Sequence, residues 1–288
     1  MDLVHKYILI GIWSIEGILA VILNLFGLYF LITHKKQKVT HILLIHLTCI
    51  DIVYICLEVI YHSIDLTVHP NTATRHWWKR IASLVLMIMQ YQTVSLLTLD
   101  RVLAVKFCLR YGVVVTKRRA KYALVFIWLI CACHTPYFIL TNGWNGWWNG
   151  WRILVFWVIL VLVFFIVAYL YIVIKVIKYK REFREITQQL THPPFKYHVP
   201  LLIVISFLCT ITLPEMFRQF EVLNYTWGAC AEYLNYIFDP LVYTLGCPHI
   251  RYRIRCLWHK VKGAKDTPVN VPWADVYTLF PGLQAHAI

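Results

Sequence analysis

The side chains with the clearest chemistry are polar groups that lie inside long apolar stretches. Asn24, Asp51 and Asp239 each interrupt such a stretch, and Asn235 lies one helical turn before Asp239. A carboxyl group in a low-dielectric interior needs a cation, a proton or a charged partner. Carboxylate and amide oxygens are hard ligands, so the set predicts a buried polar site that binds a sodium ion. A protonated, hydrogen-bonded aspartate is the alternative.

A second feature is an acid and a base side by side at the end of an apolar stretch, Asp100 and Arg101. The pair would hold the Arg101 guanidinium at the membrane edge. A helix shift would free this planar group to donate hydrogen bonds to a cytosolic partner. The alternative is a pair of boundary side chains that reach towards water. Pro214 and Pro240 break helix hydrogen bonds in later apolar stretches, which favours hinges over static kinks.

Composition shows what kind of chain must position these residues. The 288 residues are 60% hydrophobic and 15% charged, whereas soluble domains are about 45–50% apolar and about 25% charged. Such a composition excludes a disordered chain, a coiled coil and a secreted disulfide scaffold, and predicts an integral membrane protein. The net charge of +14 is scattered between the apolar stretches, so a nucleic-acid partner is not expected.

Seven apolar stretches are long enough to cross a bilayer as helices, since each crossing needs roughly 20 residues. The predicted spans are Tyr7–Ile32, Thr40–Tyr61, Ile81–Val105, Ala120–Leu140, Trp151–Ile177, Val199–Phe220 and Trp227–Leu245. Most of the 28 Lys and Arg residues fall in segments that share one side, which places the N-terminus outside and the C-terminus in the cytoplasm. The predicted organisation is an extracellular N-terminus (1–6), the bundle (7–247), an amphipathic surface helix (248–262) and a cytoplasmic tail (263–288).

The order and spacing of these features resemble the rhodopsin-like (class A) G-protein-coupled receptors, over residues 7 to about 260. The residues that match the family's motifs are Asn24, Asp51, Asp100-Arg101-Val102, Trp128, Asp239-Pro240-Leu241-Val242-Tyr243 and the arginines Arg251, Arg253 and Arg255. The resemblance implies an all-α membrane protein, a seven-transmembrane helix bundle with a short amphipathic eighth helix. It also implies that the protein transmits ligand binding to a heterotrimeric G protein.

The resemblance assigns roles to three groups of residues. The G-protein coupling group is Asp100, Arg101, Leu109, Tyr111 and Tyr243, and the sodium-binding polar network is Asn24, Asp51, Ser95, Asn235 and Asp239. The ligand pocket is Glu58, Ser83, Met87, Thr212, Glu215, Met216, Gln219, Glu232 and Tyr233. Three glutamates in this pocket favour a cationic ligand or a basic peptide. The alternative is that they pair with Arg218, Arg80 or His62, or stay neutral.

Several positions depart from the family pattern. His76 stands where an outer cysteine is usual, Thr212 replaces the sixth-span tryptophan, and the fifth span has no proline. Together with a short outer loop, Thr141–Gly150, these departures look most like the melanocortin-type branch. Successive Asn-Gly pairs in that loop predict turns. Cys256 lies just inside the last span, where either palmitoylation or an unmodified cysteine is expected.

The sequence therefore predicts a plasma-membrane receptor for signal transduction, with no enzymatic activity and no cofactor beyond the sodium ion. Its expected partners are a heterotrimeric G protein, an extracellular ligand and anionic lipids of the inner leaflet. The alternative is a cation- or proton-coupled carrier that uses Asp51, Asp239 and the glutamates within the membrane.

Overall fold

All regular secondary structure in the described part of the chain is helical. The computed structural model describes residues 3–33, 38–67, 77–107, 110–142, 147–182, 234–242 and 254. The labelled helices are α1 (Leu3–Ile32), α2 (Val39–Thr67), α3 (Trp77–Phe107), α4 (Tyr111–Val114), α5 (Lys117–Asn142) and α6 (Trp147–Glu182), and residues 234–242 form a further helix. The predicted all-α class is confirmed for these residues. The predicted span Val199–Phe220 and the predicted tail lie outside them.

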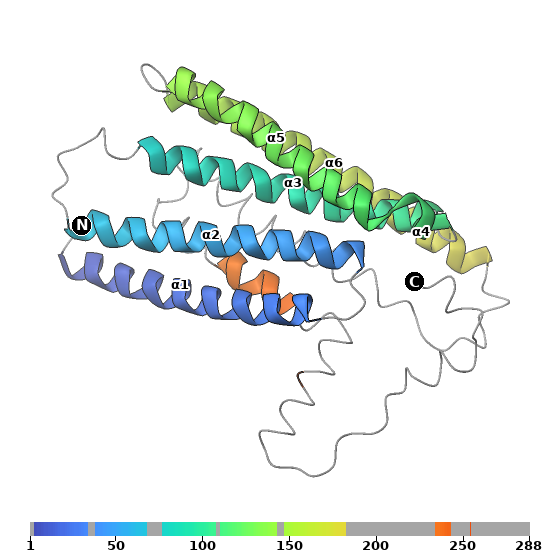
Figure 1. Ribbon diagram of the computed structural model, residues 1–288, viewed down its shortest axis with the longest axis horizontal. Coiled ribbons are helices and arrows are strands. Elements are labelled where there is room, and N and C mark those ends of the chain that lie inside the picture. The colour runs from blue at the N-terminus through green and yellow to red at the C-terminus, as the bar shows by residue number, and fades with distance from the viewer. Residues whose placement is uncertain are drawn as a thin grey trace, which may run out of the picture.

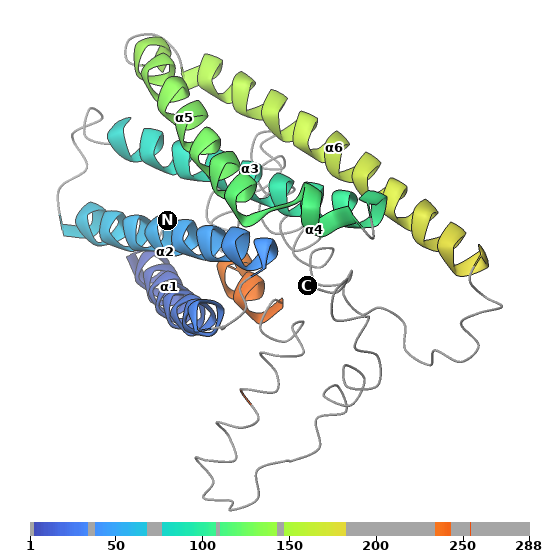
Figure 2. The ribbon, with the colours of Figure 1, turned by 45° about the vertical axis from the view of Figure 1, so that its right-hand side comes forward.

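The long helices run side by side, with α3 at the centre (Figures 1 and 2). α1 packs on α2, α2 packs on α3, and α3 also contacts both α5 and α6. The short helix of residues 234–242 lies against α1 and α2 in both views. Segments far apart in the sequence therefore meet around α2 and α3, where the predicted polar residues lie.

Among the residues that the structure describes, three helices are long and apolar enough to cross a membrane, through Gly11–Ile32, Val39–Ile60 and Ile81–Phe107, and α6 holds a shorter apolar stretch, Ile159–Lys175. A helix suits this environment because it satisfies every backbone hydrogen bond within one segment. On α1, Ile15, Ile22 and Tyr29 are spaced seven residues apart on one face and are 69%, 56% and 58% exposed. An apolar outer face of this kind suits lipid, and these helices indicate a membrane protein.

Polar side chains lie deep in the interior of the helix bundle. Asn24 and Asp51 lie near the middle of their apolar stretches and are fully buried, as is Asp239. Around them, an apolar core joins α1, α2, α3, α5 and α6 through residues such as Leu47, Val94 and Phe165. The bundle thus encloses charge-bearing groups and exposes apolar ones, the reverse of a water-soluble protein.

Trp128 joins α5 to α2 through a histidine. Its Nε1 donates a hydrogen bond to Nε2 of His46 at 2.9 Å, and Nδ1 of His46 lies 3.1 Å from Oγ1 of Thr93 on α3. The Thr93 hydroxyl donates to the carbonyl of Met89 at 2.7 Å, so its oxygen accepts the Nδ1–H of His46. A neutral histidine therefore connects α2, α3 and α5.

The loop between α5 and α6 is shorter than predicted. α5 continues to Asn142 and α6 begins at Trp147, so Asn149 and Gly150 lie within a helix. The turn predicted at this Asn-Gly pair is wrong. A glycine costs a helix only about 1 kcal/mol relative to alanine, and the long apolar segment that follows favours extending the helix beyond the pair.

Candidate functional site

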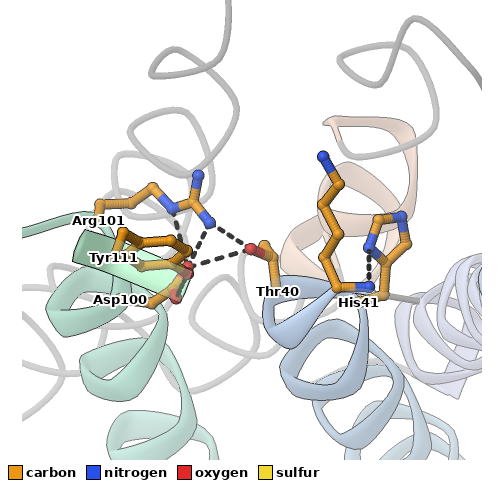
Figure 3. A network of polar contacts seen from close by, with 6 residues as sticks. Thr40, His41, Asp100, Arg101 and Tyr111 are labelled. Atoms are coloured by element: carbon orange, nitrogen blue, oxygen red, sulfur yellow. Dashed lines mark hydrogen bonds and ion pairs between the residues drawn. The ribbon is translucent and has the colours of Figure 1, made fainter. Parts of the chain in front are cut away.

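One end of the bundle carries a cluster of four hydrogen-bonded side chains, called here the ionic network: Thr40, Asp100, Arg101 and Tyr111. Thr40 lies in the first turn of α2, Asp100 and Arg101 lie near the end of α3, and Tyr111 begins α4. Figure 3 shows the four side chains converging from these three helices. The predicted pair Asp100–Arg101 is therefore part of a larger arrangement.

The Asp100 carboxylate is the centre of the ionic network. Its Oδ2 accepts hydrogen bonds from Thr40 Oγ1 at 3.0 Å and from Arg101 Nε at 3.1 Å. Arg101 Nη2 donates to the same carboxylate and to Thr40 Oγ1, and the Tyr111 hydroxyl donates to Asp100 Oδ1. Hydrogen bonds to an ionised acceptor are about twice as strong as neutral ones. The carboxylate thus ties α2, α3 and α4 together.

The two charged side chains of the ionic network differ in how deeply they are buried. The Asp100 side chain is 2% exposed, whereas the Arg101 side chain is 15% exposed. A buried carboxylate must keep its donors, but the guanidinium needs only a small movement to reach the surface. The arrangement can therefore hold Arg101 in a paired state, in which its bond to Thr40 depends on the contact between α2 and α3 and its bond to Asp100 lies within α3.

Tyr111 is held in its neutral, donating form. Burial raises the pKa of the Tyr111 phenol above its usual value, and the neighbouring Asp100 carboxylate raises it further by charge repulsion and by accepting its hydrogen bond. Because the folded-state pKa is raised, the stability that this group contributes is fully present below the unfolded pKa of about 10. It is lost only as the pH rises through the folded-state pKa.

Replacing Tyr111 with phenylalanine should therefore lower stability by an amount that does not depend on pH between 6 and 9. The change removes a hydrogen bond to the charged, buried Asp100 carboxylate, and we expect the midpoint of thermal unfolding to fall by about 2–4 °C. The measurement is thermal unfolding of both proteins in detergent across this pH range. A difference that disappears by pH 9 would mean that the phenol already ionises there.

A second cluster, called here the polar site, lies deep in the bundle and comprises Asn24, Asp51, Gln90, Asn235, Tyr236 and Asp239. Asn24 Nδ2 donates to the carbonyl oxygens of Ala20 at 2.9 Å and of Tyr236 at 2.8 Å. Asn235 Nδ2 donates to Asp239 Oδ2 at 3.3 Å. The bond to Tyr236 connects α1 to the helix of residues 234–242, whereas the Asn235–Asp239 bond lies within that helix.

Gln90 and Tyr236 belong to the polar site although the sequence did not reveal them. Gln90 Nε2 donates to Asp51 Oδ1 at 2.8 Å, and the Tyr236 hydroxyl donates to Gln90 Oε1 at 3.4 Å. The Tyr236 ring also stacks on Tyr54 of α2, with 5.2 Å between ring centroids. A glutamine inside the apolar stretch of the third span was the available signal.

Ser95, by contrast, is not brought to the polar site by any hydrogen bond that the described residues show. Its hydroxyl donates to the carbonyl of Tyr91, one turn earlier on α3, at 2.7 Å. Serine and threonine hydroxyl groups in apolar helices commonly donate to a backbone carbonyl one turn earlier. On α3, the side chain that reaches Asp51 is therefore Gln90, not Ser95.

The predicted ligand pocket is described only in part. Ser83 Oγ donates to Oε1 of Glu58 at 2.9 Å, and Glu58 is 9% exposed. Met87 is buried within the apolar core. An open apolar depression of about 370 Å³ on the surface of α2, α3 and α5 is lined by Val53, Leu57, Ile81, Ala82, Val85, Leu86 and Thr135, and none of these residues was predicted.

The remaining predicted residues lie outside the described part of the chain. They are Leu109, Thr212, Pro214, Glu215, Met216, Gln219, Glu232, Tyr233, Tyr243 and Cys256. Pro240, the second predicted hinge, is described and lies buried in the helix of residues 234–242. Both ends of the bundle thus retain predictions that the structure does not address.

No model of a known protein family matches the chain. Functional interpretation therefore depends on the ionic network and the polar site themselves. Among the described residues, no group of three His, Cys, Asp or Glu side chains is arranged to hold a metal ion.

Proposed function

We propose that the chain is a divergent rhodopsin-like (class A) G-protein-coupled receptor of the plasma membrane. The single observation that carries this proposal is the ionic network, in which a buried carboxylate holds Arg101 at one end of a helix bundle. We place this end in the cytoplasm and the N-terminus outside, as the distribution of basic residues predicts. The partner is a heterotrimeric G protein, and neither an enzymatic reaction nor a nucleic acid is involved.

The ionic network supplies a two-state element for such a receptor. In the resting state Arg101 is bound to Asp100 and Thr40, which links the end of α3 to the start of α2. When α3 moves relative to α2, the guanidinium loses its bond to Thr40, and a change in its own side-chain conformation then separates it from Asp100 and makes it available to acceptors of the G protein. Leu109, Tyr111 and Tyr243 are the further contacts proposed for this surface, which faces anionic lipids of the inner leaflet.

The energy needed for this change is within reach of ligand binding. Removing one partner of a buried ion pair costs about 3–5 kcal/mol. A ligand that shifts a population from 1:99 to 99:1 must favour one state by about 5.5 kcal/mol. One ligand that binds the outer half of the bundle can therefore open the ionic network. We propose a small or peptide ligand with positive charge, because Glu58 lies buried in that half.

A carrier remains the second candidate because two carboxyl groups lie at mid-bundle. Asp51 and Asp239 are both fully buried, and buried acids within a membrane mark ion or proton paths in transporters. In a carrier, Asp51, Asp239 and the glutamates within the membrane would bind and release a cation or a proton in turn.

Reconstituted vesicles distinguish the two functions in one preparation. Purified protein in lipid vesicles is assayed for guanine-nucleotide exchange on a panel of purified G proteins, and the same vesicles are assayed for sodium and proton flux. We expect exchange above that of protein-free vesicles for at least one G protein, with no flux above background. Flux without exchange on any member of the panel would favour the carrier.

A further inference from the structure

We propose that Gln90 takes the place of a bound cation in the polar site, so that the protein does not bind sodium there. The carboxamide of Gln90 donates from Nε2 to Asp51 Oδ1 at 2.8 Å. Both side chains are almost completely buried, at 1% and 0% exposure. A neutral donor from α3 thus faces the carboxylate, where a cation would require an oxygen ligand.

Tyr236 fixes the direction of the Gln90 carboxamide. Its hydroxyl donates to Gln90 Oε1 at 3.4 Å, so the amide oxygen is engaged and the amide nitrogen faces Asp51. Tyr236 is itself held in place, because its ring stacks on Tyr54 and its carbonyl accepts from Asn24. Turning the carboxamide to present its oxygen to an ion would break the hydrogen bond to Asp51 and would leave the Tyr236 hydroxyl facing the amide nitrogen.

The face of Asp51 that Gln90 occupies offers a cation no ligand. A hard cation is bound by oxygen atoms, whereas the group that meets Asp51 Oδ1 from α3 is the amide nitrogen of Gln90. Two fully buried carboxyl groups and an amide donor are instead suited to a site in which one carboxyl group keeps its proton.

Gln90 is therefore a positioning residue that links the helices themselves. Through it, Asp51 of α2 is connected to Tyr236 of the short helix of residues 234–242, and Asn24 extends the connection to α1. A cation bridging these helices would make their packing depend on sodium concentration. A side-chain bridge makes the packing independent of it.

Thermal unfolding in sodium and in a substitute cation tests this inference without any assay of signalling. Purified full-length protein is unfolded in detergent with sodium chloride or with an equal concentration of N-methyl-D-glucamine chloride. We expect the two unfolding midpoints of the wild type to agree within about 1 °C. A site exposed to sodium at about ten times its Kd would raise the midpoint by about 2–3 °C, and that result would overturn the proposal.

Gln90→Ser tests the cause of the sodium independence. A hydroxyl group replaces the amide donor and leaves space beside Asp51, so we expect the midpoint to fall by about 2–4 °C and to rise again when sodium is present. Gln92→Ser is the matched control, because Gln92 lies two residues along the same helix and contacts Cys131 instead; it should show no sodium response. A Gln90→Ser protein whose unfolding midpoint does not change with sodium would show that Gln90 is not what excludes the ion.

If Gln90→Ser fails to fold, two other measurements decide the question. They are the comparison of the wild type in the two salts and the same comparison for Tyr236→Phe, which frees the Gln90 carbonyl.

Discussion

Replacing Arg101 with alanine is expected to lower nucleotide exchange on the G protein at least about tenfold, to the level of protein-free vesicles. Arg101 is the charged side chain that the ionic network stores at the end of α3. Losing a group that pairs with an acceptor across an interface costs about 2–5 kcal/mol, and each 1.4 kcal/mol is about tenfold. The measurement is exchange by reconstituted protein, with the amount in the membrane determined for each variant.

Arg118→Ala is the control for this loss. Arg118 is an exposed arginine near the start of α5, and its guanidinium donates to the Tyr122 hydroxyl at 2.9 Å, outside the ionic network. Its removal changes the charge of the same end of the bundle by the same amount. We expect exchange to change by less than about twofold, as for an exposed charge. Equal losses in both variants would mean that net charge, not Arg101, drives coupling.

Replacing Asp100 with asparagine is expected to raise basal exchange about tenfold. The substitution keeps the size of the side chain but removes the charge that holds Arg101, Thr40 and Tyr111. The resting state then loses about 1.5–3 kcal/mol for each charge-assisted hydrogen bond that is weakened. The population shifts towards the state in which Arg101 is free. Exchange without ligand, per molecule of protein in the vesicle, is the quantity to compare.

Thr40→Val provides a graded comparison for Asp100→Asn. It removes only the hydroxyl that joins α2 to the ionic network and leaves the Asp100–Arg101 pair in place. We expect a smaller rise in basal exchange, of about twofold to fivefold, because the loss of the two hydrogen bonds of the Thr40 hydroxyl costs the resting state a net of about 0.5–1 kcal/mol while the Asp100–Arg101 pair remains. A decrease in exchange in both variants would show that the ionic network belongs to the active state instead.

The helices were predictable because long apolar stretches leave few alternatives. Continuous runs of about 20 apolar residues in a bilayer must satisfy their backbone hydrogen bonds within each segment. The helix ends were less predictable. The predicted span Thr40–Tyr61 corresponds to α2, which continues to Thr67. Hydropathy marks the part of a helix that lies in lipid, whereas the helix itself ends where its hydrogen bonding ends.

The polar contacts show the same limit at the level of single residues. Asp51 and Asp100 stood out because a charge in an apolar run is costly and needs a reason. Gln90 carries no charge, and its partners Asp51 and Tyr236 come from helices distant in the sequence. The packing of the helices decides which side chains from distant segments pair. The spacing of residues within one apolar stretch does not predict these pairs.

Nucleotide exchange by the double variant Asp100→Asn with Arg101→Ala, measured beside both single variants and the wild type, tests the central claim most directly. If the ionic network restrains Arg101 and the freed Arg101 drives exchange, the gain from Asp100→Asn requires Arg101. The double variant should then fall to the level of Arg101→Ala alone. A double variant that keeps the raised exchange of Asp100→Asn would contradict the account, because the gain would then arise without the arginine.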